Sequence, residues 1–281
     1  MQLKNLSHES KELEEERQKK ISILYDLSYD LSTFIASEVD GEDFHEGYLK
    51  DKKAFARLIK STLKTERNLN KYFKELSQRV WGYVNWMEYY TKIKKGQIFI
   101  EEMKWQDEVL ALLVSFTDSL DDAFEVGGQT AEKELGFSIG FTVKDVPAMN
   151  ALRKYTLQLA RDVTDTTKEI VKQSILRSIQ LGENQSQATE RLASVIQNPK
   201  RAAKIAHTET IRAYSQGKVQ VGLEVGARFK VWRNGQPGAC SICSELHDMK
   251  VKIDEDFQSS IGPIPYPPGH PNCRCILQLE M

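Results

Sequence analysis

Five side chains near the end of the chain have the types and the spacing of metal ligands. Cys240 and Cys243 form a CxxC pair, and after a gap of 26 residues the block His270-Pro-Asn-Cys273-Arg-Cys275 follows. The two-residue gap of CxxC lets both thiolates of a tight turn reach one ion, and zinc takes four nitrogen or sulfur ligands in a tetrahedron. The pattern predicts a structural zinc site made from Cys240, Cys243 and His270, completed by Cys273 or Cys275.

A second ligand set is compatible with the same residues. Five candidates compete for four positions, so the four cysteines could hold the ion while the ring N–H of His270 donates to a thiolate. Prolines stiffen the loop around His270 and lower the entropy lost when the site closes; they are Pro265, Pro267, Pro268 and Pro271. Because a β-rich cap of about forty residues buries little apolar surface, metal binding, worth roughly 10–16 kcal/mol in small zinc modules, is expected to drive its folding.

The positions of the cysteines favour metal binding over disulfides or redox chemistry. All four lie between residues 240 and 275, whereas a secreted disulfide scaffold spreads its cysteines along the chain. The CxxC pair also lacks the flanking βαβ pattern of a thioredoxin-like site. Zinc catalysis would need an open position and an acid–base group, and Glu245, His247 and Asp248 keep that alternative open. No other nucleophile or general-base constellation is found, so we predict that the protein is not an enzyme.

The composition is that of a globular protein outside the membrane. Of 281 residues, 28% are charged and 40% are hydrophobic, and the formal net charge is −1. Any affinity for nucleic acid must therefore come from local patches. A bilayer-spanning helix needs about 20 apolar residues, and the best candidate, 109–116, is too short. Residues 1–20 are densely charged and lack the apolar segment of a signal peptide, so a cytosolic protein is expected.

The first 135 residues are predicted to be helical. Apolar residues recur every three or four positions from residue 21 to residue 34. A second stretch carries aromatic residues that we interpret as anchors of a core or of a partner helix; they are Trp81, Tyr83, Trp86, Tyr89 and Tyr90. The segment 101–135 holds ten acidic residues against two lysines, which predicts a solvated helix face or a surface that meets basic groups.

Helices resume after Pro147 and give way to short strands. A capping box at Thr166 and Glu169 predicts the start of a helix that stops at Leu181–Gly182, and Ser186 predicts another start. Pro199 suits the first turn of a third helix that stops at Gly226. Short strands are expected near residues 229–231, 250–253 and 276–279. The predicted fold is mainly α. It has an elongated helical N-terminal region (1–135), a linker (136–149) and a helical domain (150–281) that ends in a small β-rich zinc-binding cap (226–281).

The helix that begins near Pro199 is rich in basic residues. Between residues 200 and 233 there are eight basic and two acidic residues. Such a patch predicts contacts to nucleic-acid phosphates, for which the candidates are Lys200, Arg201, Lys204 and Arg212. An ordinary solvated helix face with a Glu209–Arg212 pair is the alternative.

A series of landmarks in the last 132 residues resembles a known family. In order, they are His207-Thr-Glu209-Thr-Ile-Arg212-Ala-Tyr214-Ser-Gln-Gly217, Gly226, Trp232, the CxxC pair, Phe257 and Pro267-Pro268-Gly-His270-Pro-Asn-Cys273-Arg-Cys275. This order resembles the C-terminal domain of the phage Mu protein F-like minor head proteins, over roughly residues 150–281. The closing His-Pro-Asn-Cys-Arg-Cys block is the most specific part of the resemblance.

The resemblance implies a minor structural protein of a tailed-phage or prophage head. It implies association with the portal protein and with major capsid or scaffolding protein, and a role in head morphogenesis, DNA packaging or DNA ejection. The expected location is the interior of the phage head, after assembly in the host cytoplasm, with packaged DNA as a further partner. The alternatives are a zinc-dependent enzyme and a DNA-binding zinc protein. A zinc finger that reads DNA places a helix beside the metal, whereas here the cysteines lie in proline-rich loops.

Overall fold

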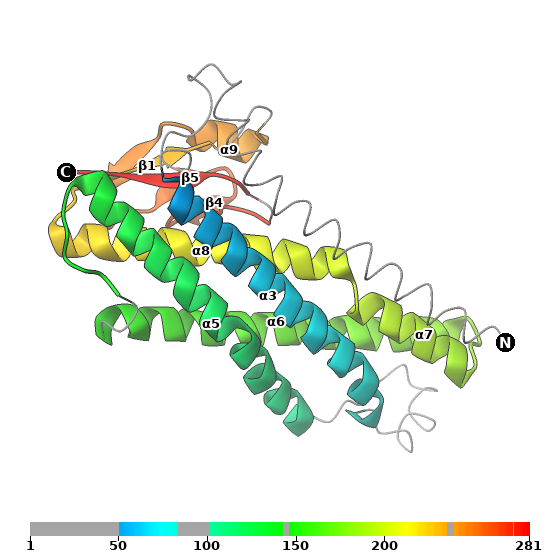
Figure 1. Cartoon of the computed structure of the whole chain (residues 1–281). Helices are drawn as coiled ribbons and strands as arrows, with labels where there is room; N and C mark the ends of the chain where they lie inside the picture. Colours follow the sequence, from blue (N-terminus) through cyan, green and yellow to red (C-terminus); the bar gives the residue numbers. More distant parts are fainter. Residues whose placement is uncertain (1–50, 84–101, 143–145, 235–238, 272) are drawn as a thin grey trace. The chain divides into compact units, whose positions relative to one another are not determined.

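The computed structural model describes residues 51–83, 102–142, 146–234, 239–271 and 273–281 (Figure 1). Its helices are α3 (Lys52–Arg79), η1 (Val80–Tyr83), α5 (Glu102–Leu135), α6 (Val146–Gln180), α7 (Gln185–Ile196), α8 (Pro199–Val225) and α9 (Ser241–Leu246). Its strands are β1 (Phe229–Arg233), β2 (Lys250–Lys252), β3 (Phe257–Ser259), β4 (Gly262–Ile264) and β5 (Ile276–Glu280). The expectation of a mainly helical chain with a small C-terminal strand region is confirmed.

Residues 57–281 form one compact unit. This unit includes the residues predicted as a linker, 136–149, and the proposed domain division stays a prediction. The apolar stripe at residues 21–34 and the aromatic residues Trp86, Tyr89 and Tyr90 lie outside the described residues. Within the described parts, no helix combines the length and the apolar character that crossing a membrane requires.

From Arg57 onward, α3 runs antiparallel to α5, and polar side chains join the two helices. Arg57 donates to Asp122 at 2.8 Å, and Thr65 Oγ1 donates to Ser119 Oγ at 2.8 Å. Near the other end of the pair, Glu108 is 2% exposed and accepts hydrogen bonds from Arg79 at 2.6 and 2.7 Å and from Tyr83. The acidic run of α5 thus meets basic groups of the same chain, one of the two outcomes that its charge predicted.

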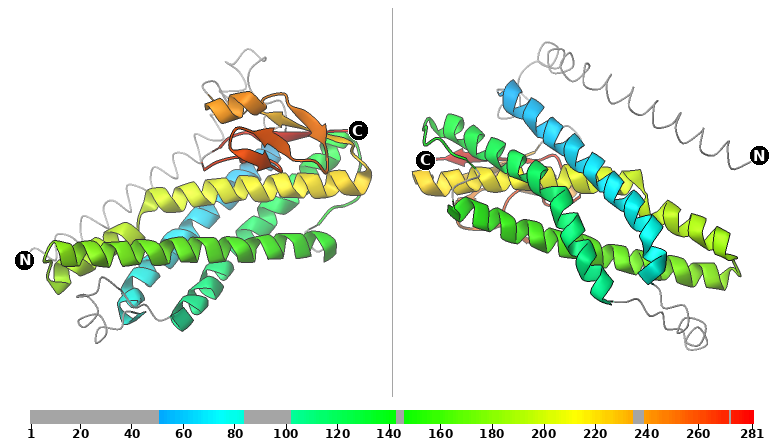
Figure 2. Two further views of the ribbon diagram at one scale, coloured as in Figure 1. Left: turned by 180° about the vertical axis from the view of Figure 1, so that it is seen from behind. Right: turned by 60° about the horizontal axis from the view of Figure 1, so that its bottom comes forward.

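Two glycines allow α5 and α8 to cross in backbone contact (Figure 2). A Cβ atom at Gly127 of α5 would lie 1.9 Å from the carbonyl oxygen of Tyr214, and one at Gly217 of α8 would lie 2.0 Å from that of Phe124. Real Cβ atoms do not approach oxygen so closely, so the crossing requires glycine at both positions. Beside it, Phe141 packs against Phe124 with ring centroids 5.7 Å apart.

The helix boundaries correct two predictions and confirm three. Thr166 does not start a helix, because α6 continues through it and its hydroxyl donates to the carbonyl of Asp162. The cap of α7 is Asn184 rather than Ser186, in a capping box with Gln187. The stop at Gly182, the Pro199 start after the Asn198 cap and the left-handed Gly226 that ends α8 are as predicted; Gly182 has φ +65° and Gly226 φ +77°.

The C-terminal cap contains an antiparallel sheet of order β2-β1-β5 and a β3–β4 hairpin. In it, Trp232 of β1 is fully buried and meets Phe257 of β3 edge to face, with ring centroids 5.3 Å apart. The cap is also joined to the helices. Lys218 of α8, 2% exposed, donates to the carbonyl of Leu277 in β5 at 2.6 Å and pairs with Glu134 of α5. The cap therefore has an apolar core and a helical support besides any metal.

Candidate metal centre

The CxxC pair forms the start of α9, a helix that the sequence did not predict. Cys240 is the N-cap, and its Sγ accepts the backbone N–H of Cys243 at 3.5 Å. This hydrogen bond is the main reason that the pKa of Cys240 is lowered, since an N–H donor favours the thiolate. The start of the helix thus directs both sulfurs to one side, Cys240 exposed and Cys243 buried.

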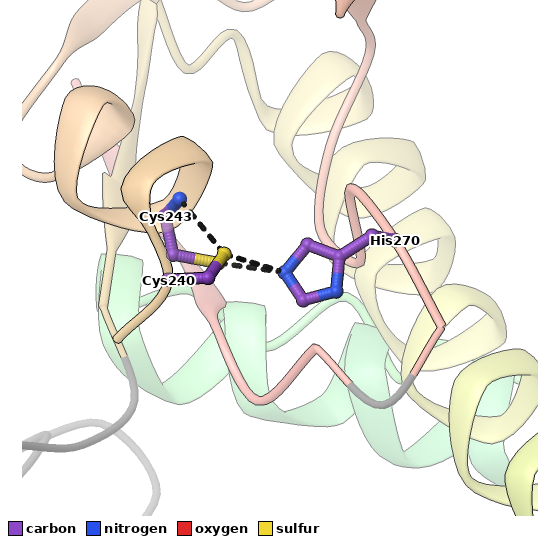
Figure 3. A group of neighbouring side chains, drawn as sticks. All are labelled: Cys240, Cys243 and His270. Carbon is purple, nitrogen blue, oxygen red and sulfur yellow. Dashed lines mark hydrogen bonds between the residues drawn. The ribbon is translucent and has the colours of Figure 1, made fainter. Parts of the chain in front are cut away.

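His270 reaches the same place from the proline-rich loop (Figure 3). Its Nε2 lies 3.1 Å from Cys240 Sγ and 3.0 Å from Cys243 Sγ. Its other nitrogen, Nδ1, lies 3.0 Å from the carbonyl oxygen of Pro271. A carbonyl can only accept, so Nδ1 carries the proton and the Nε2 lone pair faces the two sulfurs. This is how histidine ligands are normally oriented by the groups around them.

Cys273 and Cys275 complete the cluster from the segment before β5. Cys243 Sγ lies 3.6 Å from Cys273 Sγ, and the sulfur atoms of Cys243, Cys273 and Cys275 are all within 4.8 Å of one another. A tetrahedral zinc ion places two sulfur ligands about 3.8 Å apart, and sulfur and nitrogen about 3.5 Å apart. The measured separations are close to these values, and far above the roughly 2.05 Å of a disulfide. All four cysteines are free thiols.

The surroundings assign different protonation states to the buried thiols. Hydrogen bonding from the Cys275 thiol, and then from the backbone N–H groups of Cys275 and Gly269, lowers the pKa of Cys273 to about 5 despite its burial. The same contact raises the pKa of Cys275, which acts as the donor. Burial raises the pKa of Cys243 to about 12. Cys273 is therefore prepared as a thiolate, the form that binds metal.

The structure brings all five predicted ligands together in two groups that share Cys243. One group is Cys240, Cys243 and His270, and the other is Cys243, Cys273 and Cys275. Either could hold a metal ion. The donors are sulfur and imidazole nitrogen without a carboxylate, which suits zinc and does not suit magnesium or calcium.

The three acid–base candidates of the catalytic alternative lie outside both groups. Glu245 accepts the backbone N–H of Ser260 at 3.3 Å, and His247 Nδ1 accepts that of Asn234 at 3.1 Å. Asp248 pairs with Arg233. Each side chain is thus engaged in a local contact, and none belongs to a described metal-type cluster.

The sequence did not predict that His207 of α8 contacts the segment of the ligands, or that Tyr155 of α6 joins the Glu209–Arg212 pair. His207 of α8 hydrogen-bonds the backbone of Cys273, and burial lowers its pKa, so its ring is neutral. Next to it, Glu209 accepts hydrogen bonds from Tyr155 of α6 and, at 3.2 Å, from Arg212. None of these residues has a ligand-like spacing from the cysteines, so only the fold reveals the connection.

Two of the four predicted nucleic-acid contacts are exposed lysines, and the other two are arginines that contact groups of the same protein. Lys200 and Lys204 are exposed on α8. Arg201 instead donates to Thr167 at 2.8 Å and stacks over the ring of Phe73, 4.7 Å from its centroid. Arg212 is paired with Glu209, the arrangement that the alternative reading expected. Contact of the four residues with nucleic acid stays a prediction.

The fold and the site define a helical protein with a cysteine- and histidine-rich cap of metal-binding type. Residues 169–278 match the family model described as Phage Mu protein F like protein. The matched segment includes the second part of α6, all of α7 and α8, and the metal centre. This part of the chain is therefore similar to the family that its landmarks suggested, and that family suggests a phage head-related protein. No curated protein and no solved structure gave a significant match.

Proposed function

We propose that the protein is a minor structural component of a tailed-phage or prophage head, and that zinc holds its cap together. The observation that carries the proposal is the coincidence of two findings. The segment that matches the Mu F-like family contains the five ligand-type side chains, which form two metal-type groups that share Cys243. A structural ion would explain why cysteine and histidine side chains gather here while the acid–base candidates take part in other contacts.

Within this proposal, the four ligands are Cys240, Cys243, His270 and Cys273. Cys273 is favoured over Cys275 because its Sγ lies 3.6 Å from that of Cys243 and because its neighbours lower the pKa of its thiol. Cys275 would then donate to the Cys273 sulfur, as a partner that orients a ligand. The zinc-edge X-ray absorption of purified protein should show one nitrogen and three sulfur ligands. Three protein ligands and a water would instead support the enzymatic alternative.

The proposed partners are the portal protein and the major capsid or scaffolding protein of the head. The test is mass spectrometry of procapsids assembled with and without portal. Wild-type protein should be found in the first and depleted from the second. Cys243→Ser should enter procapsids poorly, whereas the exposed Ser244→Ala next to it serves as a matched control and should enter normally. Equal incorporation without portal would overturn the association with portal.

A further inference from the structure

The outward face of α3 carries a continuous row of basic side chains. Lys60, Lys64, Arg67, Lys71 and Lys74 are all exposed and follow one another at intervals of three or four residues. With 3.6 residues per turn and 1.5 Å per residue, they lie within an arc of about 80° and extend over about 21 Å of helix. These five residues are called the α3 basic row below.

Nearby acidic groups neutralise little of this row. Lys64 pairs with Asp118 at 3.5 Å, and Lys71 pairs with Glu75 at 4.0 Å, and the acidic partners are 79% and 52% exposed. Such exposed pairs contribute roughly 0–1 kcal/mol, so both lysines can turn to another anion at small cost. Among the described residues, no ion pair involves the other three members, Lys60, Arg67 and Lys74.

We infer that the α3 basic row binds the phosphate backbone of duplex DNA without sequence preference. Phosphates of one DNA strand follow each other every 3.4 Å along the helix axis, so a row of about 21 Å faces about six of them. Four of the five side chains are lysines, which act as point charges. Base recognition relies on arginine, asparagine or glutamine in bidentate contacts, and the row holds one arginine.

An acidic protein partner fits this surface less well. Protein interfaces depend on buried aromatic or aliphatic anchors with a charged rim. The large hydrophobic side chains that are exposed in the described residues are all on other elements, none of them on α3. A surface with charge and no anchor matches a polyphosphate, whose binding comes mainly from the release of counterions.

The inference goes beyond the proposed head function and does not depend on it. The α3 basic row lies outside residues 169–278 and outside the metal centre. It also differs from the predicted patch on α8, where Arg201 and Arg212 are held by contacts within the protein. DNA binding by purified protein can therefore succeed or fail independently of incorporation into heads.

The test is the salt dependence of binding to a fluorescent DNA duplex, measured by anisotropy. Five phosphate contacts give a slope of log K against log salt of about −4.5, or a fall in affinity of about 500-fold between about 50 and about 200 mM salt. The variant K60Q/K64Q/K71Q/K74Q should make the slope shallower by about 3.6. Glutamine has nearly the helix propensity of lysine, so circular dichroism should be unchanged.

Two matched variants separate the row from bulk charge. R153Q/K154Q/R161Q/R177Q removes four charges from exposed positions on α6 and should keep the wild-type slope. K60R/K64R/K71R/K74R keeps the charge of the row and should keep the affinity. An equal loss of affinity in the α6 variant would overturn the inference. So would polyglutamate of matched length binding as tightly as the duplex, because the partner would then be an acidic protein.

Discussion

The metal centre and the paired helices α3 and α5 are held together by different kinds of contact. At the candidate metal centre, all five ligand-type side chains come from residues 240–275 and form two groups that share Cys243, either of which could hold an ion. Between α3 and α5, the ion pairs join residues 29 to 68 positions apart in the sequence. The spacing of ligand-type residues in a short segment therefore predicts its chemistry from the sequence. A pairing between two long helices, in contrast, is found only from the structure.

The largest expected effect follows the loss of metal, and it should be confined to the cap. Chelation would remove the ion, and Cys243→Ser removes the residue that both ligand groups share. Binding worth roughly 10–16 kcal/mol in small zinc modules is then lost to the cap. Hydrogen exchange should show amides of residues 239–275 losing most of their protection, while those of α3 and α5 keep theirs.

The apolar core of the cap limits that effect. Since Trp232 and Phe257 are buried and β5 is tied to α8 through Lys218, the strands β1 and β5 should retain more protection than α9 and the proline-rich loop. Full protection of α9 after complete removal of metal would show that the ligand cluster has no structural role. Cys275→Ser should keep about one zinc per chain if Cys273 is the fourth ligand.

The sequence predicted features that depend on a few neighbouring residues, and it did not predict those that depend on contacts between distant segments. The CxxC and HxxCxC spacings pointed to the five side chains that the structure gathers in two metal-type groups. The glycine and proline signals at Gly182, Pro199 and Gly226 located helix ends, because these effects act within a few residues. The start at Thr166 was wrong because the local capping pattern is overridden by packing of the continuous α6. Helix α9 was missed because its six residues are too few for a helical period.

The helical partners of the cap and the role of the acidic run could not be derived in this way. Ten acidic residues in 101–135 left two outcomes open. Only the antiparallel placement of α3 decides that Arg57 and Arg79 meet them. Likewise, nothing near Gly127 or Gly217 in the sequence indicates that each is needed because another backbone passes within about 2 Å of its missing Cβ.

The next largest effect is expected at the glycine crossing of α5 and α8. In Gly127→Ala, the new methyl group would overlap the carbonyl oxygen of Tyr214, so the two helices must separate and their shared core must open. Overpacking of this kind usually costs 1–3 kcal/mol, and contact with backbone rather than with a movable side chain places the expected loss at about 4 kcal/mol. Urea unfolding measures it. Gly82→Ala, with no atom within 4 Å of its Cβ, should be close to neutral.

A somewhat smaller effect is expected for Glu108, the buried carboxylate between α3 and α5. Glu108→Gln leaves Arg79 without its charged partner, and breaking a buried pair costs about 3 kcal/mol. Asp107→Asn, the exposed neighbour, should change stability by less than about 0.5 kcal/mol. A loss at Glu108 no greater than that at Asp107 would show that the ion pair does not hold the helices.

The same carboxylate gives the helices a dependence on pH. Burial works to raise the pKa of Glu108, but hydrogen bonds from Arg79 and Tyr83 outweigh it, so the pKa of Glu108 lies below its ordinary value of 4.5. A lowered pKa in the folded state means that the stabilisation is present above pH 4.5 and is lost as the pH falls through the folded pKa. Unfolding curves between pH 7 and pH 3 should show this loss in wild type and a shallower one in Glu108→Gln.

The smallest effect is expected for an ion pair on the surface of the cap. Like the pair between Arg79 and Glu108 it joins opposite charges, but it is exposed to water. Lys250 of β2 reaches across β1 to Glu280 of β5 at 2.5 Å and lies over the ring of Phe229, 4.4 Å from its centroid. Its side chain is 47% exposed, so Lys250→Gln should cost less than about 1 kcal/mol and should fade in high salt. A cost equal to that of Glu108→Gln, measured by the same urea titration, would mean that solvent exposure does not separate the two regions, and the contrast between them would then rest on the metal alone.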